Sequence, residues 1–138
     1  MPEGYEIVDV AEIGTEPFPE SGIEHAKLTE ALGARDMRVN ALILEPGQVV
    51  GYHTHERQEE IYVCTEGPGE VFVDGDLREV PQGGVIRIRA DVPRQLVNTT
   101  EAETHRWVMF GAPTVGTVED FGEYQVATGG YGSEHPSG

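Results

Sequence analysis

Residues 47–67 read Gly-Gln-Val-Val-Gly-Tyr-His-Thr-His-Glu-Arg-Gln-Glu-Glu-Ile-Tyr-Val-Cys-Thr-Glu-Gly and contain the most informative pattern in the chain. His53 and His55 are two positions apart, so on an extended strand both side chains project from the same face. Glu59 and Glu60 offer a carboxylate just before the next β-rich run. Two imidazoles and one carboxylate on neighbouring strands can form a facial triad, which holds a divalent metal and leaves coordination positions open.

The sequence around this stretch predicts short strands separated by turns. A weakly alternating run at 37–44 enters the turn Glu45-Pro46-Gly47, and Asp74-Gly75-Asp76 predicts a tight hairpin. Further strands are expected at 49–55, 60–65, 70–74, 77–80, 85–88, 94–98 and 105–110. About ten short strands without a convincing helix predict an all-β sandwich or small barrel.

The two ends of the chain are less regular. Residues 5–10 predict a first strand, whereas 25–32 are compatible with either a strand or one helical turn. Periodicity is lost from Thr114, and the Gly-rich residues 129–138 are expected to form a mobile tail. The prediction is therefore one domain over 1–138, with N-terminal strands in 1–38 and an irregular tail over 114–138.

The charge balance is strongly acidic, with 9 Lys and Arg against 25 Asp and Glu and a net charge of −16. Lys27 is the single lysine, and the acidic residues are spread along the whole chain. Such a surface repels nucleic acid and anionic membranes, because both require cationic contacts. We interpret it as an adaptation to a high-salt cytoplasm, where charge repulsion is screened; an ordinary acidic protein is the alternative.

Cys64 is the only cysteine, so the chain forms no internal disulfide and no thiolate metal cluster. The N-terminal residues lack the basic and apolar regions of an export signal, and no apolar run approaches membrane-spanning length. A cytoplasmic location is expected.

The order of the motif residues resembles the cupin superfamily of small jelly-roll barrels. The first cupin motif is matched throughout by Gly47, His53, His55, Glu60 and Gly67. The second motif is matched in part, by Gly75, Pro81, Gly83 and Asn98. The resemblance covers roughly residues 39–113 and implies a cupin-type double-stranded β-helix, in which His53, His55 and Glu60 point into the barrel as metal ligands.

Arg94 departs from this pattern, because it stands where most metal-binding cupins have a histidine as the fourth ligand. A guanidinium cannot be a ligand, and it remains cationic at any relevant pH. Two alternatives stay open. In one, three ligands hold Fe, Mn, Ni or Zn while Arg94 reaches an anionic group of the substrate. In the other, Arg94 pairs with Glu60, as a bidentate partner, and no metal is held.

Other residues have a plain structural interpretation beside the functional one. Tyr62 and Trp107 are expected to line one strand face, where core packing is the default and substrate contact the alternative. Cys64 is more typical of a small buried hydrophobe than of a nucleophile. His105 is expected to be a hydrogen-bonded barrel residue, and His25 to be solvated.

Two functions follow from the resemblance. One is a metal-dependent oxygenase or isomerase for a small anionic or sugar-like substrate, and the other is a non-catalytic ligand-binding or sensor cupin. The resemblance also implies a homodimer, because cupins commonly pair through sheet edges or exchanged N-terminal strands.

Overall fold

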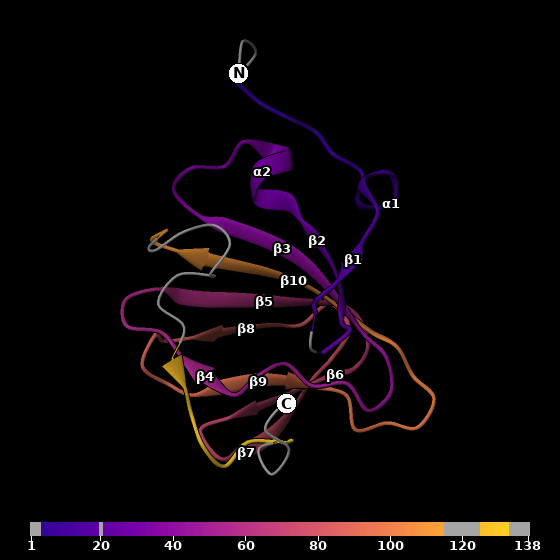
Figure 1. The fold of residues 1–138 in the computed structure, drawn as a ribbon, viewed down its shortest axis with the longest axis vertical. Helices are drawn as coiled ribbons and strands as arrows, with labels where there is room; N and C mark the ends of the chain where they lie inside the picture. The colour runs from indigo at the N-terminus through magenta and orange to yellow at the C-terminus, as the bar shows by residue number, and fades with distance from the viewer. Residues whose placement is uncertain (1–3, 20, 115–124, 133–138) are drawn as a thin grey trace.

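The computed structural model describes residues 4–19, 21–114 and 125–132, and it consists of two antiparallel sheets facing each other (Figure 1). The six-stranded sheet has the order β1 (Glu16–Pro17), β2 (Glu24–Lys27), β3 (Arg38–Leu44), β10 (His105–Ala112), β5 (Glu59–Glu66), β8 (Val85–Ile88). The five-stranded sheet has the order β11 (Gln125–Val126), β4 (His53–Thr54), β9 (Arg94–Val97), β6 (Gly69–Val73), β7 (Asp76–Val80). Among the described residues no strand of one sheet pairs with a strand of the other. The all-β cupin-type barrel expected from the sequence is confirmed.

Two short helices lie in the N-terminal part. The expected strand over 5–10 is wrong: no strand forms there, and α1 (Val10–Ile13) begins where the Asp9 carboxylate accepts a hydrogen bond from the Ala11 N–H. Residues 25–32, for which a strand and a helical turn were both compatible with the sequence, contain one of each. The end of β2 is followed directly by α2 (Leu28–Leu32). Gly33 ends α2 in the left-handed conformation, with φ 72°, that favours glycine.

The main core lies between the two sheets. Strands of both sheets alternate, so that every second side chain points into the barrel. The buried members of this core are Ile23, Leu42, Leu44, Tyr62, Cys64, Val71, Val80, Ile88, Leu96 and Trp107. The expectation that 25 is a solvated position is wrong, because His25 is buried and its ring stacks on Phe18 at 3.6 Å between centroids. This core fixes which face of each strand can carry a site.

A smaller apolar cluster covers the outer face of the six-stranded sheet. Ala26, Leu28 and Val39 are its buried members, and α2 closes it from outside (Figure 1). The Thr29 hydroxyl donates to the Val39 carbonyl and accepts from the Val39 N–H, so α2 is also attached to β3 by hydrogen bonds. The N-terminal part therefore packs on the sheet rather than extending it beyond β1.

The predicted strands from β5 to β9 are found within a residue or two of their expected bounds. The predicted hairpin is formed by β6 and β7, with Val73 opposite Asp76. Asp74 and Gly75 both have positive φ, 51° and 86°, as a two-residue turn between twisted strands requires. The turn chemistry read from the sequence is confirmed here.

The strand expected over 49–55 is much shorter in the structure. Val49 makes an isolated bridge to Val97, and regular pairing returns only at β4. Asn98 holds the far end of this region, because its Nδ2 donates to the carbonyls of Leu44 and Glu103. Asn98 is therefore a buried structural residue.

The C-terminal residues 125–132 lie against the five-stranded sheet. β11 extends that sheet beside β4, and Gly130 is buried, so the expectation of a free tail is wrong for 129–132. Residues 133–138 lie outside the described residues. Within the described ranges, no helix is long and apolar enough to cross a membrane.

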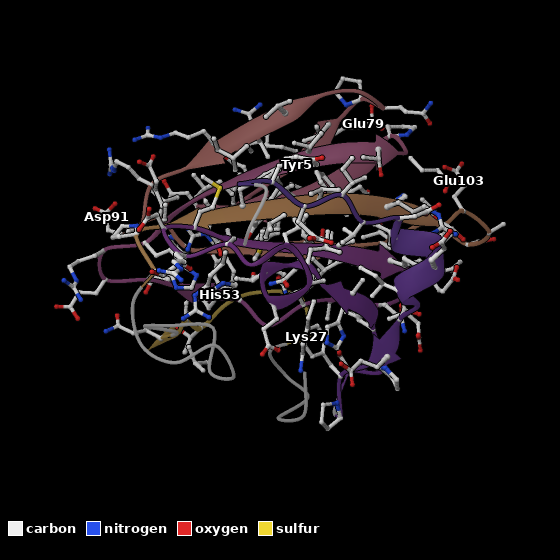
Figure 2. The ribbon with its side chains drawn as sticks, turned by 90° about the horizontal axis from the view of Figure 1, so that it is seen from above. Tyr5, Lys27, His53, Glu79, Asp91 and Glu103 are labelled. Atoms are coloured by element: carbon white, nitrogen blue, oxygen red, sulfur yellow. The ribbon has the colours of Figure 1, made fainter. Side chains whose placement is uncertain are left out.

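The barrel has two distinct ends. Figure 2 places His53 and Asp91 at one end and Glu103 at the opposite end. Register agrees, because Glu60 on β5 lies opposite Gly111 at the end of β10, whereas His105 at the start of β10 lies opposite Leu44. The first of these ends carries the predicted metal ligands.

Candidate metal centre

Three predicted ligands meet inside the barrel. His53 is on β4, His55 is the first residue after that strand, and Glu60 is on β5 of the other sheet. All three are at most 5% exposed, and one potential ligand atom from each lies within 4.8 Å of the others. Glu59, the alternative carboxylate, points outward and pairs with Arg87 at 2.8 Å. The cluster therefore joins the two sheets at one end of the barrel.

His53 is held in a form that suits metal binding. Its Nδ1 lies 2.8 Å from the Gly51 carbonyl oxygen, and because a carbonyl only accepts, Nδ1 carries the proton and Nε2 presents a lone pair. Burial lowers the pKa of His53 to about 4, against the opposing attraction of Glu60. The imidazole is thus neutral at pH 7, as a ligand must be.

Glu60 is the negative centre of the cluster. Its Oε1 accepts a hydrogen bond from the Tyr62 hydroxyl at 2.7 Å, and its Oε2 lies 3.3 Å from His55 Nε2. Burial alone would raise the pKa of Glu60, but His55, His53 and Arg94 together lower it. The side chain is therefore a carboxylate whose orientation is set by its neighbours.

Arg94 enters the same space from β9, opposite His53 in the register. It is fully buried, and its Nη2 donates to the Arg89 carbonyl at 2.6 Å. Its Nε lies 3.6 Å from Glu60 Oε1, which is not the bidentate pair that the second of the two alternatives requires. Among the described residues, Nε and Nη1 have no hydrogen-bond partner. The guanidinium therefore places a positive charge beside the ligands, and the ligands do not accept hydrogen bonds from all of its N–H groups.

The two aromatic candidates lie at different depths. Tyr62 touches Glu60 and belongs to the site. Trp107 is opposite Cys64, four residues along β10 from the position opposite Glu60, which is roughly 13 Å along a strand. Its ring packs in the core against Gly69, where an added Cβ would lie 2.3 Å from Cζ2. The structure does not bring Trp107 to the ligands.

Cys64 lies on the inner face of β5 at the level of Trp107, and it is fully buried. Burial raises the pKa of its thiol, so the uncharged form is favoured. The side chain therefore behaves as a small hydrophobe of the core, as the sequence indicated.

Sequence reasoning missed one polar neighbour of the ligands. Gln58 is 1% exposed, and its side chain lies over Gly111, which is itself opposite Glu60. Its Nε2 donates to the Pro113 carbonyl at 3.2 Å. No sequence signal marks a buried glutamine, because Gln is mostly an exposed residue. Only the missing side chain at Gly111 makes room for it.

His105 also differs from expectation. It is completely buried at the far end of β10, and neither ring nitrogen has a hydrogen-bond partner among the described residues. The prediction that it is hydrogen-bonded within the barrel is therefore wrong for the described part of the chain. It is not near Glu60, so it is not a further ligand.

The donor set fits a divalent transition metal. It combines two imidazoles, one of them fixed with a proton on Nδ1, and a carboxylate held in its charged form. Nitrogen and oxygen donors of this kind suit Fe, Mn, Ni and Zn and do not distinguish sharply among them. His53, His55 and Glu60 form a cluster that can bind a metal, with Arg94 as the one feature that opposes it.

Comparison with known proteins agrees with the fold. The sequence profile of the cupin domain family matches residues 41–111. No curated protein matches the chain.

Solved structures also resemble it. A predicted oxalate decarboxylase from Thermotoga maritima is 24% identical, with a TM-score of 0.69 over 79% of this chain and 100% of that one. A sugar phosphate isomerase of the cupin superfamily from Silicibacter pomeroyi is 24% identical, with a TM-score of 0.69 over 79% of this chain and 76% of that one. A polyketide cyclase from Streptomyces resistomycificus is 20% identical, with a TM-score of 0.73 over 96% of this chain and 94% of that one. At these identities the likeness shows the fold alone.

Proposed function

This chain belongs to the cupin superfamily, and from that premise we propose that it is a metal-dependent oxygenase or isomerase acting on a small anionic or sugar-like substrate. The observation that carries the proposal is the buried cluster of His53, His55 and Glu60. Burial of two imidazoles and a carboxylate costs free energy that their mutual contacts offset in part. A bound metal would offset more of it, which supports a metal-binding role for the cluster.

The chain's own residues prepare the cluster. The Gly51 carbonyl fixes the tautomer of His53, and the Tyr62 hydroxyl fixes the carboxylate of Glu60. Such partners orient the ligands, and the carbonyl that accepts from His53 also raises the basicity of its other ring nitrogen. A bound divalent ion supplies Lewis acidity toward a substrate oxygen, and a redox-active ion can also react with dioxygen.

Arg94 is the proposed anchor for the substrate's negative charge. Its guanidinium is buried beside the ligands, and two of its nitrogens have no hydrogen-bond partner among the described residues. A carboxylate or phosphate would satisfy them with charge-assisted hydrogen bonds. Two of the similar structures carry names that refer to anions, oxalate and a sugar phosphate, which agrees with this choice. Tyr62 remains a predicted substrate contact, and the buried position of Trp107 does not favour that role.

Metal titration tests the proposal directly. Metal-stripped protein, purified without affinity nickel, is titrated with Fe(II) under anaerobic conditions, and separately with Mn(II), Ni(II) and Zn(II). We expect one site per chain for at least one ion, and His53→Ala is expected to abolish it. His105→Phe is the matched control, because it removes a fully buried histidine at the other end of the barrel.

The second step is a substrate screen with the ion that binds best, using small carboxylates, sugar phosphates and dioxygen consumption. Arg94→Met is expected to raise KM for the anionic substrate. Failure of all four ions to bind better than weakly, with the wild-type fold intact, would remove the enzyme proposal.

One observation favours a second function. The 3.6 Å contact between Arg94 and Glu60 partly neutralises the carboxylate, and it is compatible with a non-catalytic cupin that binds a small ligand without metal. This alternative predicts no bound metal in elemental analysis of the freshly purified protein, and binding of a small anion that Arg94→Met removes.

The proposal also covers the domain organisation, the cellular location and the partners of the protein. We propose one domain over residues 1–138, a cytoplasmic location in a high-salt cell, a small-molecule ligand, and no nucleic-acid or membrane partner, because the net charge is −16. Tyr5 and Ile7 are 65% and 83% exposed, and such apolar exposure supports a homodimer formed through the N-terminal segment. Sedimentation at the monomer mass would remove the dimer.

A further inference from the structure

The strand that carries His53 is held weakly by its own sheet. β4 has only two residues, and its register with β9 consists of the single pair His53 and Arg94. On its other side lies β11, which pairs Gln125 with Thr54 and Val126 with His53. An isolated two-residue strand has little stability of its own. Val50 and His55 are attached on either side of it, by N–H groups that donate to the Leu96 and Ala90 carbonyls, so the position of His53 depends in part on what holds β11.

Residues 125–132, here called the C-terminal strap, continue from β11 across the outer face of the five-stranded sheet (Figure 1). The Ala127 N–H donates to the Tyr52 carbonyl, next to His53. The ring of Tyr131 packs edge-on against Phe72 of β6, with 5.1 Å between centroids. The strap thus links β4 to β6 over the outside of β9.

Gln95 fastens this strap. Its side chain is 1% exposed and lies on the face of β9 opposite to that of Arg94. Its Nε2 donates to the carbonyls of Val50 at 2.7 Å and Tyr131 at 2.8 Å, and its Oε1 accepts from the Tyr131 N–H at 2.8 Å. Both amide hydrogens and the amide oxygen are used, so one side chain joins β9, the chain entering β4 and the strap.

The fit of the strap leaves no spare room. A Cβ added at Gly130 would lie 2.5 Å from Tyr52 Cβ and 2.8 Å from Gln95 Oε1. Contacts this short force the strap or Tyr52 to move. The close approach ties the strap to the residue that precedes His53.

We propose that Gln95 is a positioning residue for the metal centre: its amide fastens the C-terminal strap and thereby holds His53 at the distance from Glu60 that a metal requires. The inference rests on the proposed metal function. Gln95 does not touch the ligands, and it acts through the strap and through β4. Loss of a direct hydrogen-bond partner of a ligand typically lowers metal affinity by about 10–100-fold, and for Gln95, one step further out, we expect an effect at the lower end of that range.

The test uses the full-length chain and Co(II), whose visible absorption reports the geometry of its ligands. Gln95→Met removes all three hydrogen bonds, and Gln95→Glu keeps the size and the acceptor but cannot donate. Gly130→Ala displaces the strap while the sequence of β9, Gln95 included, stays unchanged. We expect all three variants to bind Co(II) about tenfold more weakly and with a changed spectrum.

Two controls separate positioning from loss of stability. Gln48→Met removes a side-chain amide that accepts from the Glu45 N–H in the turn at the other end of the barrel. Val126→Ala alters a strap side chain that is 82% exposed. Both are expected to bind Co(II) like the wild type, even where the melting temperature falls.

Hydrogen exchange of the metal-free proteins gives the independent readout. In the Gln95 and Gly130 variants, exchange should accelerate at the amides of Ala127 and of His55, which donate to Tyr52 and Ala90. If the strap amides exchange faster but Co(II) affinity and spectrum are unchanged, the proposal is overturned. If wild-type protein binds no metal, the proposed function fails, and exchange at His55 still decides whether Gln95 holds β4.

Discussion

Arg94 Nε lies 3.6 Å from Glu60 Oε1, and the two side chains are 0% and 3% exposed. This separation is too long for a hydrogen bond, so the two charges attract each other without satisfying Arg94's donors. A buried charge whose partner is removed is strongly destabilising, whereas replacing both partners by neutral groups is often tolerated. The pair is therefore energetically coupled.

Glu60→Gln should destabilise the metal-free protein by about 3 kcal/mol, because it leaves the Arg94 charge buried without compensation. Adding Arg94→Met to this variant should recover most of the loss. Chemical denaturation of the four proteins gives the coupling. Glu59→Gln is the matched control, since its pair with Arg87 is exposed and should be worth less than about 1 kcal/mol. Additive single losses would show that the pair does not interact.

Arg94→His should raise metal affinity by at least about tenfold, or about 1.4 kcal/mol. The change removes a repulsive charge and offers a further imidazole at the position opposite His53. Calorimetric titration of metal-stripped protein measures the effect. Arg87→His on the outer face is the control. An unchanged affinity would mean that position 94 does not face the bound ion.

Acidification should destabilise the metal-free protein between about pH 6.5 and about pH 4. The pKa of His53 is about 4 in the folded protein, whereas an exposed histidine, as in the unfolded chain, has a pKa of 6.5. Between these values the unfolded chain therefore binds more protons than the folded protein. Stability therefore rises with pH through the window, by roughly 3 kcal/mol at most. The lowered pKa of Glu60 adds a loss below its ordinary value of 4.5. His53→Asn should flatten the upper part of the profile, and an unaltered slope would contradict the prediction.

Gly69→Ala should destabilise the protein by about 1–3 kcal/mol, because the added Cβ overlaps the Trp107 ring. Trp107 is the only tryptophan, so its fluorescence reports the displacement. Val85→Ala, at a position 60% exposed, should change neither quantity. Wild-type emission and stability in the glycine variant would place Trp107 elsewhere.

Added salt should stabilise the protein, because it screens the repulsion among 25 acidic and 9 basic residues. The Debye length falls from about 10 Å to about 3 Å between 0.1 M and 1 M salt. The melting temperature should therefore rise over that range in NaCl. A flat response in NaCl would remove the argument for adaptation to a high-salt cytoplasm.

The predicted strands are found in the structure where the turn residues and the alternation of apolar and polar residues indicate the same strand bounds. The hairpin at Asp74 and Gly75 and the strand β8 are found as predicted, because local sequence specifies both. Residues 5–10 have β-forming side chains but pair with no strand in the described part of the chain, and pairing rather than propensity makes a strand. The two-residue strands β4 and β11 are too short to give any periodic signal.

The sequence predicts those site residues that belong to a motif with fixed spacing. His53, His55 and Glu60 follow a fixed pattern, and the structure gathers them within 4.8 Å. The geometry of Arg94 was not predictable, because the carbonyl of Arg89 draws part of its guanidinium away from Glu60. Gln58 and Gln95 were missed, since their burial depends on Gly111 and Gly130, which lie far away in the sequence.

The three proposed ligands all fall within residues 53–60, although β9, β10 and β11, which pair with the strands that carry them, come from distant parts of the chain. An unfolded molecule therefore already carries the whole donor set in one short loop. We expect it to bind metal ions more readily than an unfolded chain whose ligands are scattered. Because ligand bound by the unfolded chain offsets stabilisation of the native state, metal will raise the melting temperature by less than its native-state affinity implies.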